Sequence, residues 1–303
     1  MTLIEIETFL AIIKYGNLST AAKKLFISQP ALTQRLQLME QELGYPLIKR
    51  QKGHRTIQLT DQGVEFYHIA WKWQQLLEET NSISTNTSKE SLAVASVNSV
   101  SQYLLAHILP DFLKLDFRLR LYNVFSEDAY QYMAEGLYDL AFIEQQDFNS
   151  KVPHGVYTKP AFSESFVVAS YSELPHTDGG YIDIHSLKPD KEIFVPWNNE
   201  FKAWHTNNFD DKISPLVFLE DVSMMNCFFL EDSWVIAPYT TGKGLCEKGA
   251  NVYLIPDGPP KRIIYYLTRG NTKKAAIEML LSLLDSHLKT MPKNEIVSFL
   301  QHS

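Results

Sequence analysis

The stretch SQPALTQRLQLMEQELG, residues 28–44, combines helical spacing of apolar residues with a polar face that carries little charge. Ser28 is a favoured helix N-cap, and Pro30 falls in the first turn, where a missing N–H costs little. The apolar residues recur every three or four positions and form one stripe: Leu32, Leu36, Met39 and Leu43. This spacing predicts a helix whose stripe faces a protein core.

The face opposite that stripe is rich in amides. A step of about 100° per residue places Pro30 and three glutamines there, with Gln29 and Thr33 on one flank. Glutamine can bond a base edge with two hydrogen bonds, and threonine offers a hydroxyl and a methyl group. Solvated helix faces are usually rich in Glu and Lys, so we interpret this face as a surface for DNA bases and keep a solvated face as the alternative. The three glutamines are Gln34, Gln37 and Gln41.

Two shorter helical patterns precede this stretch. Apolar residues at helical spacing run from Leu3 to Ile13, and the run stops at Gly16. We expect Ser19 to cap a second short helix and residues 26–27 to form the turn before the third. Three helices in this order predict a helix-turn-helix whose third helix lies in the major groove of DNA.

A β-hairpin is predicted after Gly44. Residues 46–50 and 55–59 have strand character and flank a turn with a basic tip. Such a wing would reach an adjacent minor groove or the phosphates. The basic residues that we assign to it are Arg50, Lys52 and Arg55.

Charge is unevenly distributed along the chain. Eight Lys and Arg against four Glu give residues 1–60 a net charge of +4, whereas the whole chain carries −7. Local positive charge suits a polyanionic partner, because phosphate neutralisation depends on the binding face and not on the whole protein. The alternative is a chance fluctuation within a short window.

A further helix is predicted from Asp61. Its apolar residues form a wide face: Phe66, Ile69, Ala70, Trp73, Leu76 and Leu77. A helix between two domains has little of its own domain to pack against. We therefore interpret the face as a pairing surface for a second subunit and keep a rigid spacer as the alternative. The small polar residues 81–88 are expected to form a hinge.

Residues 9–63 resemble the DNA-binding domain of the LysR-type transcriptional regulators. The matching segments are FLAIIKYGNLSTAAKKL at 9–25, ISQPALT at 27–33, LMEQELG at 38–44, PLIKR at 46–50 and LTDQG at 59–63. Ile48 stands where the family usually has an aromatic residue. Gln34-Arg35 inverts the usual order of a basic residue and an amide, which would change the sequence that is read.

The resemblance implies roles for the start of the third helix and for the wing. Gln29, Pro30, Thr33 and Gln34 would meet base edges. Ser28 and Ala31 would lie against the DNA backbone, and Arg50, Lys52 and Arg55 would serve the wing. Residues 1–60 would thus form a winged helix-turn-helix domain, and 61–90 a dimerisation helix and hinge.

From residue 91 the pattern alternates between strands and helices, which predicts an α/β domain. Asn98, Ser99 and Ser126 follow predicted strands, where they can cap the next helix. In open α/β sheets ligands bind at such strand ends, against helix N-termini. Caps with a purely structural role are the alternative.

The resemblance implies that residues 91–303 form an effector-binding domain, a two-lobed α/β fold of the type II periplasmic-binding-protein kind. Residues 91–163 and 266–303 would form lobe I and residues 164–265 lobe II, with crossings near Phe162 and Tyr265. An unknown small molecule would bind between the lobes. The implied contacts are Asn98, Ser99 and Ser126 from lobe I and Pro196, Trp197 and Asn198 from lobe II.

Aromatic and acidic residues are frequent near this predicted cleft, at 197–205 and 229–234. They could favour a cationic or planar ligand through cation–π and charge contacts. Equally, Phe201 and Trp204 could be core residues of lobe II.

No pattern predicts an enzyme, a metal site or a cofactor. The chain lacks the G-x-S-x-G, H-E-x-x-H and P-loop motifs, and its nine histidines lack metal-site spacing. Cys227 and Cys246 have apolar neighbours that do not suit a low-pKa redox thiol. The chain has neither a signal pattern nor an apolar run near the roughly 20 residues of a membrane helix, so we expect a cytoplasmic protein.

These observations predict a sequence-specific transcription regulator controlled by a small-molecule effector. Subunits would pair through the helix from Asp61 and place two recognition helices on half-sites of double-stranded DNA. The resemblance further implies a homotetramer that contacts DNA at two places and bends it. One alternative is a regulator whose C-terminal domain serves assembly only, with a cleft filled by side chains. The other is a small-molecule enzyme or carrier with a vestigial DNA-binding head.

Overall fold

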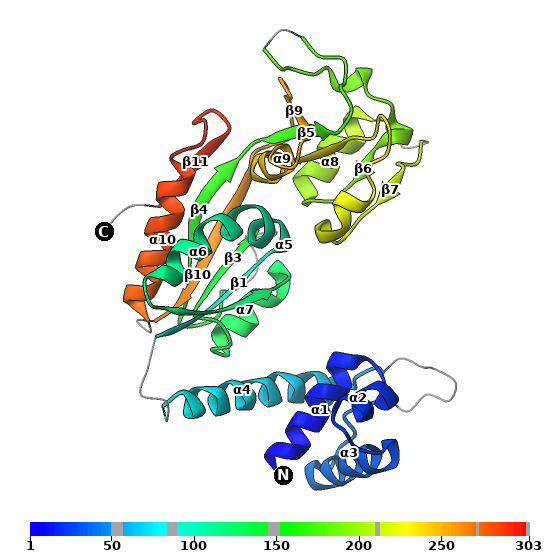
Figure 1. Cartoon of the computed structure of the whole chain (residues 1–303), viewed down its shortest axis with the longest axis vertical. Helices are drawn as coiled ribbons and strands as arrows, with labels where there is room; N and C mark the ends of the chain where they lie inside the picture. The colour runs from blue at the N-terminus through cyan, green and yellow to red at the C-terminus, as the bar shows by residue number, and fades with distance from the viewer. Residues whose placement is uncertain are drawn as a thin grey trace. The chain divides into compact units, whose positions relative to one another are not determined.

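The computed structural model describes residues 1–49, 57–83, 90–144, 152–177, 179–209, 213–270 and 273–300. It divides into two compact units, Met1–Ser88 and Lys89–Ser303 (Figure 1). The predicted wing-tip residues Arg50, Lys52 and Arg55 lie outside the described residues. No helix in the described part is both long and apolar enough to cross a bilayer.

The first unit contains the predicted helix-turn-helix. Its described helices are α1 (Leu3–Tyr15), α2 (Leu18–Lys24), α3 (Gln29–Leu43) and α4 (Asp61–Ile83). Gly16 ends α1 in the left-handed region, as predicted, and Phe26 occupies the turn before α3 with a φ of 57°. Ser19 does not cap α2. Asn17 does, because its side-chain oxygen accepts from Thr20 N at 2.7 Å, so the helix begins one residue before Ser19.

Helix α3 is fixed at its start and along one face. Ser28 caps it by accepting from Ala31 N, which confirms the predicted cap. Leu32, Leu36 and Met39 are buried in a core shared with α1 and α2, whereas Leu43 is half-buried. One face of α3 therefore holds the domain together and leaves the opposite face to solvent.

The base of the predicted hairpin is tied directly to α3. Ile48 and Leu59 form an antiparallel bridge, and Lys49 N donates to Gln58 O at 2.8 Å. The buried carboxylate of Glu40, on α3, accepts from the N–H of Leu47 at 2.8 Å and from that of Ile48 at 3.2 Å. A charged acceptor makes these bonds stronger than neutral ones, so the hairpin base is held against the recognition helix.

The apolar face of α4 is only partly available for pairing, because its own domain buries some of the residues that we expected to pair. Phe66 and Ala70 are buried in the core of the first unit, and the Phe66 and Phe9 rings are 5.2 Å apart. Ile69, Trp73 and Leu76 remain exposed. The first half of α4 thus packs on its own domain. Helix α4 also continues through Ile83, so residues 81–83 of the expected hinge are helical, and residues 84–88 lie outside the described part.

Six strands of the second unit form the sheet of lobe I, in the order β11-β4-β10-β3-β1-β2. Their bounds are β1 (Ser91–Ser96), β2 (Arg118–Asn123), β3 (Leu140–Glu144), β4 (Val156–Glu164), β10 (Arg262–Arg269) and β11 (Ile296–Ser298). The pairs β1–β2 and β1–β3 are parallel, whereas β10 is antiparallel to both neighbours.

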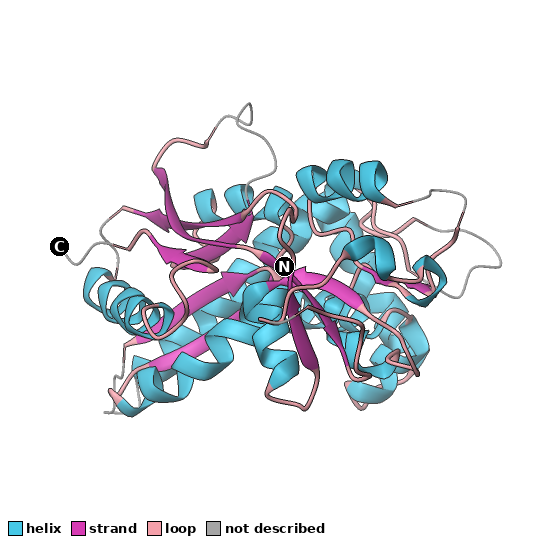
Figure 2. Ribbon diagram, turned by 90° about the horizontal axis from the view of Figure 1, so that it is seen from above, coloured by secondary structure: helices cyan, strands magenta, loops and turns pink. Residues whose placement is uncertain are grey.

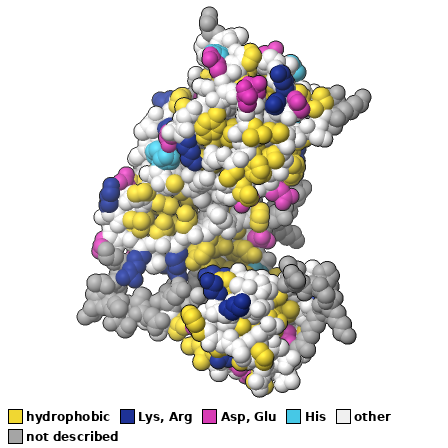
Figure 3. Space-filling model, turned by 45° about the vertical axis from the view of Figure 1, so that its right-hand side comes forward, with side chains coloured by type: hydrophobic (Ala, Val, Ile, Leu, Met, Phe, Trp, Pro, Cys, Tyr) yellow, Lys and Arg dark blue, Asp and Glu magenta, His cyan; other side chains and the backbone are white. Residues whose placement is uncertain are grey.

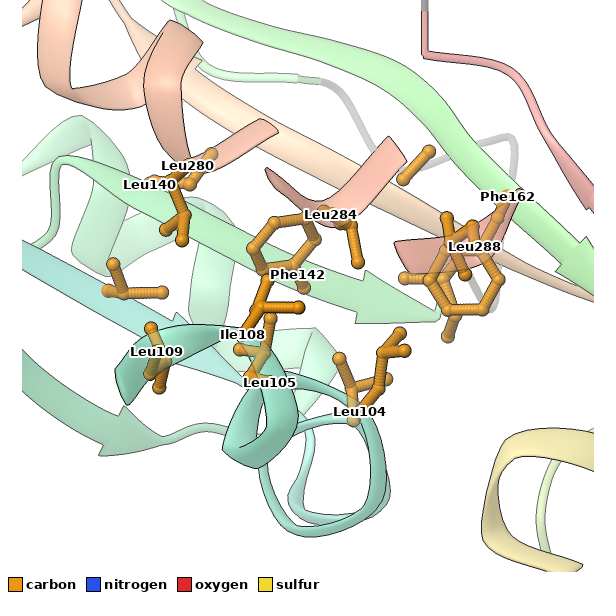
Figure 4. Packing of buried hydrophobic residues seen from close by; sticks show 14 of the residues in the cluster. Leu104, Leu105, Ile108, Leu109, Leu140, Phe142, Phe162, Leu280, Leu284 and Leu288 are labelled. Carbon is orange, nitrogen blue, oxygen red and sulfur yellow. The ribbon is translucent and has the colours of Figure 1, made fainter. Parts of the chain in front are cut away.

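Helices cover the buried strands of this sheet (Figure 2). They are α5 (Asn98–Val100), a π turn (Ser101–Leu105), α6 (Ala106–Lys114), α7 (Ser126–Ala134) and α10 (Lys274–Leu288). Helices α6 and α10 pack together, and Figure 4 shows Phe142 of β3 close to Ile108 of α6 and Leu284 of α10. Every residue of β3 is buried, which explains its uninterrupted apolar sequence up to Glu144.

Lobe II contains two small sheets and two α-helices. Strands β5 (Phe166–Ser170), β8 (Val235–Pro238) and β9 (Asn251–Leu254) form one sheet, and β6 (Ile193–Phe194) and β7 (Val217–Phe218) form the other. The α-helices in its described residues are α8 (Asn199–Asn208) and α9 (Tyr239–Cys246), and short 3-10 helices span Ile184–Ser186, Pro189–Lys191 and Val222–Cys227. This two-lobed α/β architecture confirms the predicted fold class.

The chain passes between the lobes close to the positions expected. The crossings were expected near Phe162 and Tyr265, and both of these residues lie inside strands of the lobe I sheet. The first crossing is Ser165, between β4 and β5, and the second precedes Arg262. Residues 262–265 all pair with β4, and Ile264 and Tyr265 also pair with β3. Pairing of this kind has no signature in the apolar pattern of one strand.

Apolar side chains also remain on the surface. On the face drawn in Figure 3 they gather into patches, with charged side chains around and between them. In lobe II, Phe218 and Met224 are exposed, and in lobe I so are Leu113 and Leu121. The second unit therefore retains apolar area that contact with another molecule would cover.

The close approach of α4 to the hairpin base predicts a strict requirement for Gly63. A Cβ at this position would lie 2.0 Å from the carbonyl oxygen of Leu47, a backbone atom that cannot rotate away. Gly63→Ala is expected to destabilise the first unit by about 2 kcal/mol or more. Hydrogen exchange of the α1 and α3 amides in the full chain measures this loss. The matched Gln62→Ala, on the exposed side of the same turn, should leave exchange unchanged.

Candidate functional site

The outward face of α3 is exposed and uncharged at its N-terminal end. Gln29, Pro30, Gln34 and Gln37 are exposed, and together with half-buried Thr33 they line a shallow hollow of about 430 Å³. The Thr33 hydroxyl donates to Gln29 O at 2.9 Å, so its proton is already engaged and its methyl group is the remaining apolar feature. The amides and this methyl group match the kinds of contact that base edges accept.

The same domain carries exposed basic side chains outside this face. Lys23 and Lys24 are exposed in the last turn of α2, and Lys49 is exposed at the hairpin base. The first turn of α3 carries no acidic residue. The arrangement separates neutral groups that can read bases from cations that can attract phosphates.

A second candidate site lies between the lobes of the second unit. It is a pocket of about 610 Å³ at the carboxyl ends of β1, β2 and β3, closed on the other side by the segment after β6 and by residues 220–222. Open α/β sheets place ligands at this edge. Five of the six predicted effector residues line it: Asn98, Ser99, Ser126, Pro196 and Trp197.

The predicted helix caps in this region are wrong, and the side chains make other contacts. Asn98 and Ser126 begin α5 and α7, but neither forms a side-chain cap bond. The Ser126 hydroxyl accepts from Glu144 N at 3.1 Å, and the Ser99 hydroxyl accepts from Arg262 Nη2 at 2.9 Å. These hydroxyls fix other pocket residues instead of closing helix ends.

Asn198, the sixth predicted effector residue, is not among the lining residues. It caps α8, because its Oδ1 accepts from Phe201 N at 2.7 Å. Its Nδ2 donates to Glu144 Oε1, a carboxylate that does line the pocket. Asn198 therefore does not line the pocket, but it helps to position Glu144, which does.

A buried guanidinium forms the floor of the pocket. Arg262, at the start of β10, donates through Nε to Glu144 Oε2 at 2.9 Å, and its Nη1 lies 3.6 Å from Glu164 Oε1. Burial raises the pKa of Glu164, while Arg262 and two hydrogen bonds from Thr240 act in the opposite direction. The carboxyl groups of Glu144 and Glu164 thus both lie beside the guanidinium of Arg262, and all three side chains are buried.

Two amide–carboxylate hydrogen bonds join the lobes across the pocket in opposite senses. Asn98 of lobe I donates to Asp221 Oδ1 of lobe II at 2.6 Å. Asn198 of lobe II donates to Glu144 of lobe I. Each lobe therefore supplies one amide and one carboxylate, and the two bonds hold the lobes in their present arrangement.

The aromatic residues near the pocket have different roles. The Trp197 ring lines the pocket, donates through Nε1 to Ile236 O at 2.7 Å and has the Arg262 guanidinium 5.7 Å from its centroid. Phe201 is fully buried in the core of lobe II, and Trp204 packs against that core. His205 bonds Glu192 at 2.8 Å among aromatic neighbours. For Phe201 and Trp204 the core interpretation is therefore correct.

Sequence reasoning missed the charged residues of this pocket. Glu144 ends the apolar strand LAFIE, and a carboxylate at the carboxyl end of a buried strand is a signal that could have revealed it. Arg262, Glu220 and Asp221 stand in segments without such a pattern. No cluster of metal-ligating side chains is present in the part of the chain that the structure describes.

The fold and these surfaces define a helix-turn-helix protein with a two-lobed α/β domain. The family model described as "Bacterial regulatory helix-turn-helix protein, lysR family" matches residues 3–64. The chain is 31% identical over 220 residues to the uncharacterized HTH-type transcriptional regulator YwqM of Bacillus subtilis (strain 168), covering 70% of this chain and 72% of that protein. The chain belongs to the LysR family.

Other relatives are also transcriptional regulators. The chain is 26% identical to the probable cat1 operon transcriptional activator of Acinetobacter lwoffii and 29% identical to YtlI of Bacillus subtilis (strain 168). The matched part spans 65% and 64% of the length of these two proteins.

Solved structures of full-length regulators share the fold. The crystal structure of CbnR in complex with its target DNA has a TM-score of 0.63 at 17% identity, covering 94% of this chain and 99% of that chain. A full-length OxyR variant from Pseudomonas aeruginosa has a TM-score of 0.51 at 19% identity, covering 94% of this chain and 99% of that one.

The raised pKa of Glu164 predicts how stability changes with pH. A carboxyl whose pKa is higher when folded stabilises the folded state below its ordinary value of 4.5, and this contribution is lost as pH rises through the folded pKa. Relative to Glu164→Gln, the wild type should therefore lose stability as pH rises above about 4.5, by at most about 1.4 kcal/mol per pH unit.

Urea unfolding of the full chain at a series of pH values checks this expectation. Glu173→Gln, at an exposed carboxyl of lobe II, should leave the stability difference from wild type flat across the series. If the wild type kept the same stability relative to Glu164→Gln across the series, or gained stability relative to it as pH rises, the assigned direction would be wrong.

Proposed function

We propose that this protein is a sequence-specific DNA-binding transcription regulator whose activity responds to a small molecule bound between its two lobes. The observation that carries the proposal is the exposed, uncharged outward face at the start of α3, in a domain that has exposed basic side chains and matches the LysR family model. The regulatory names of the relatives support the same conclusion.

DNA binding is assigned to residues from both parts of the domain. Gln29, Pro30, Thr33 and Gln34 would contact base edges, and Ser28 and Ala31 would lie against the sugar-phosphate backbone. Arg50, Lys52 and Arg55 would carry the phosphate or minor-groove contacts of the wing. These roles stay a proposal that the exposure of α3 supports.

Pairing of subunits is assigned to the exposed face of α4. Ile69, Trp73 and Leu76 are exposed and form a stripe along the helix, next to the buried Phe66 and Ala70. Contact with the same face of a second subunit would remove these side chains from water and place two recognition helices on adjacent half-sites. Apolar surface on the second unit would support a tetramer.

The small molecule is assigned to the pocket that contains Asn98, Ser99, Ser126, Pro196 and Trp197. The pocket has a volume of about 610 Å³, so side chains do not fill the space between the lobes. This volume argues against a C-terminal domain used for assembly alone. An effector would act by binding one arrangement of the lobes more tightly than another, because binding shifts an equilibrium only by its differential affinity.

The test of DNA reading compares Gln34→Ala with Gln41→Ala by nuclease footprinting. The footprint is made on DNA upstream of the protein's own gene, or on genomic fragments selected with the full chain. Gln34→Ala should weaken binding to the specific site about 5- to 150-fold, from the loss of about 1–3 kcal/mol of base contact, and should leave non-specific binding unchanged. Gln41 is exposed two turns further along α3 and should tolerate the change.

Salt dependence separates this proposal from an enzyme or carrier. About six phosphate contacts would make the logarithm of affinity fall with the logarithm of salt with a slope near −5. An unchanged footprint for Gln34→Ala would remove the base-reading role of this side chain. Affinity for duplex DNA that does not depend on salt would contradict the proposal as a whole.

The pairing role of α4 predicts a change of assembly for Leu76→Asp. Leu76 is 61% exposed, so a carboxylate is tolerated in the isolated subunit but would be buried without a partner in a dimer. Sedimentation equilibrium should show a dissociation constant for the dimer that is raised at least about 100-fold, since about 3 kcal/mol is lost. Gln74→Asp, at an exposed position of α4 beside the pairing stripe, should assemble as the wild type does.

A further inference from the structure

We propose that the pocket between the lobes binds a small organic cation, a molecule with an ammonium or guanidinium group, held by the carboxylates of Glu220 and Asp221 and by the rings of Phe125 and Trp197. The inference rests on the proposed function in assigning the effector to this pocket, and it adds the chemical class of the effector.

The charged residues that line the pocket are mostly acidic. Glu144, Glu220 and Asp221 contribute carboxylates, and Arg262 is the one basic residue among the described lining residues. The pocket wall therefore has an excess of negative charge, which attracts a cation and repels an anion.

Arg262 offers little to an anionic ligand, although its buried Nη1 forms no hydrogen bond. It is 3% exposed, and its Nε and Nη2 already donate to Glu144 and Ser99. A second carboxylate, that of the fully buried Glu164, lies 3.6 Å from its Nη1. An anion that approached this guanidinium would also approach two carboxylates, so the local charge balance would oppose its binding.

Glu220 and Asp221 differ from Glu144 because they are exposed and have no ion pair with a basic side chain in the described part of the chain. Hydrogen bonds from Ser223 lower the pKa of Asp221, and the one from Asn98 acts in the same direction. Asp221 therefore stays ionised at neutral and moderately acidic pH. These two carboxylates are the negative charges that a ligand can neutralise.

Aromatic rings from both lobes complete the proposed site. Phe125, at the start of α7 in lobe I, lines the pocket and is 79% exposed, an unusual state for a large apolar side chain. Trp197 lines it from lobe II. The position of the Arg262 guanidinium 5.7 Å from the Trp197 ring centroid shows that this ring already accepts a cation on one side. Ring faces and carboxylates together are the groups that recognise organic ammonium ions.

The start of α7 is the feature that opposes this assignment. A helix N-terminus carries about half a positive charge and favours anions. Asp128 N and Ala129 N of α7 already donate to Phe125 O, which engages part of that positive end. Two full carboxylates outweigh half a charge, so a cation remains the favoured ligand.

The same groups connect the ligand to the arrangement of the lobes. Asn98 Nδ2 donates a hydrogen bond to Asp221 Oδ1 at 2.6 Å, and this bond joins lobe I to lobe II. An ammonium group is also an N–H donor, and it carries a full charge that the amide lacks, so it can take the place of Asn98. A cation would thereby replace one hydrogen bond between the lobes and bind their two arrangements with different affinity.

The test uses the full chain and three probes of similar size: benzylamine, benzyl alcohol and benzoate. Ligand-observed NMR titrations should show benzylamine binding at least about tenfold more tightly than benzyl alcohol, with benzoate the weakest. Glu220→Gln and Asp221→Asn should each weaken benzylamine several-fold and leave benzyl alcohol unchanged. Asparagine keeps the cap that Asp221 provides to Ser223 N, so folding is preserved.

Glu173→Gln is the matched control, because Glu173 is exposed on lobe II and does not line the pocket. The proposal is overturned by tighter binding of benzoate, by equal affinity for all three probes, by no binding of benzylamine, or by a loss in Glu173→Gln equal to that in the pocket variants.

Footprints on the same preparations keep the two proposals apart. If the protein gave a specific footprint but did not bind benzylamine more tightly than benzyl alcohol and benzoate, the cation assignment would be overturned and the regulatory function would stand. A missing footprint with an intact preference for benzylamine would count against the regulatory function and leave the ligand class in place.

Discussion

The second unit depends on one buried guanidinium, that of Arg262. It lies at the point where the chain returns from lobe II to lobe I, and it contacts the carboxylates at the ends of β3 and β4. Removal of a buried charge partner is costly, since the remaining charge keeps its desolvation penalty without compensation. Glu144, Glu164 and Arg262 therefore require one another, and the Ser99 hydroxyl depends on them for its position. The strand ends, the crossing and the pocket floor are parts of one electrostatic unit.

The first unit, by contrast, depends on the absence of charge from one exposed face of a helix. Its recognition helix buries one stripe and keeps charge away from the exposed N-terminal face, so no side-chain ion pair must be broken before that face meets another polar surface. Rigidity comes from the far side of the helix. Glu40 binds the backbone of the hairpin base, and Phe66 and Ala70 extend the same core into α4. Neutral amides on a rigid support lose little conformational freedom when they bind.

The sequence predicted much of the first unit and less of the second. The spacing of Leu32, Leu36 and Met39 placed α3 correctly, and Ser28 was recognised as its cap, because both depend on neighbours within a few turns. The cap of α2 was misplaced because Asn17 and Ser19 are both good caps, and only the backbone conformation distinguishes them. The side chains of Asn98 and Ser126 were taken as caps, although the structure uses them for contacts with residues far away in the sequence.

By itself, the sequence determined the order of the elements, the fold class, the neutral face of α3 and five of the residues that line the pocket. These follow from periodicity and from local chemistry, which are properties of short segments and of the family pattern they match. Only the tertiary structure decided which apolar residues of α4 are buried, where the lobes cross and which charges meet at Arg262. Ion pairs between residues more than a hundred positions apart, such as Glu144 with Arg262, leave no spacing in the sequence, because only the folded chain brings them together.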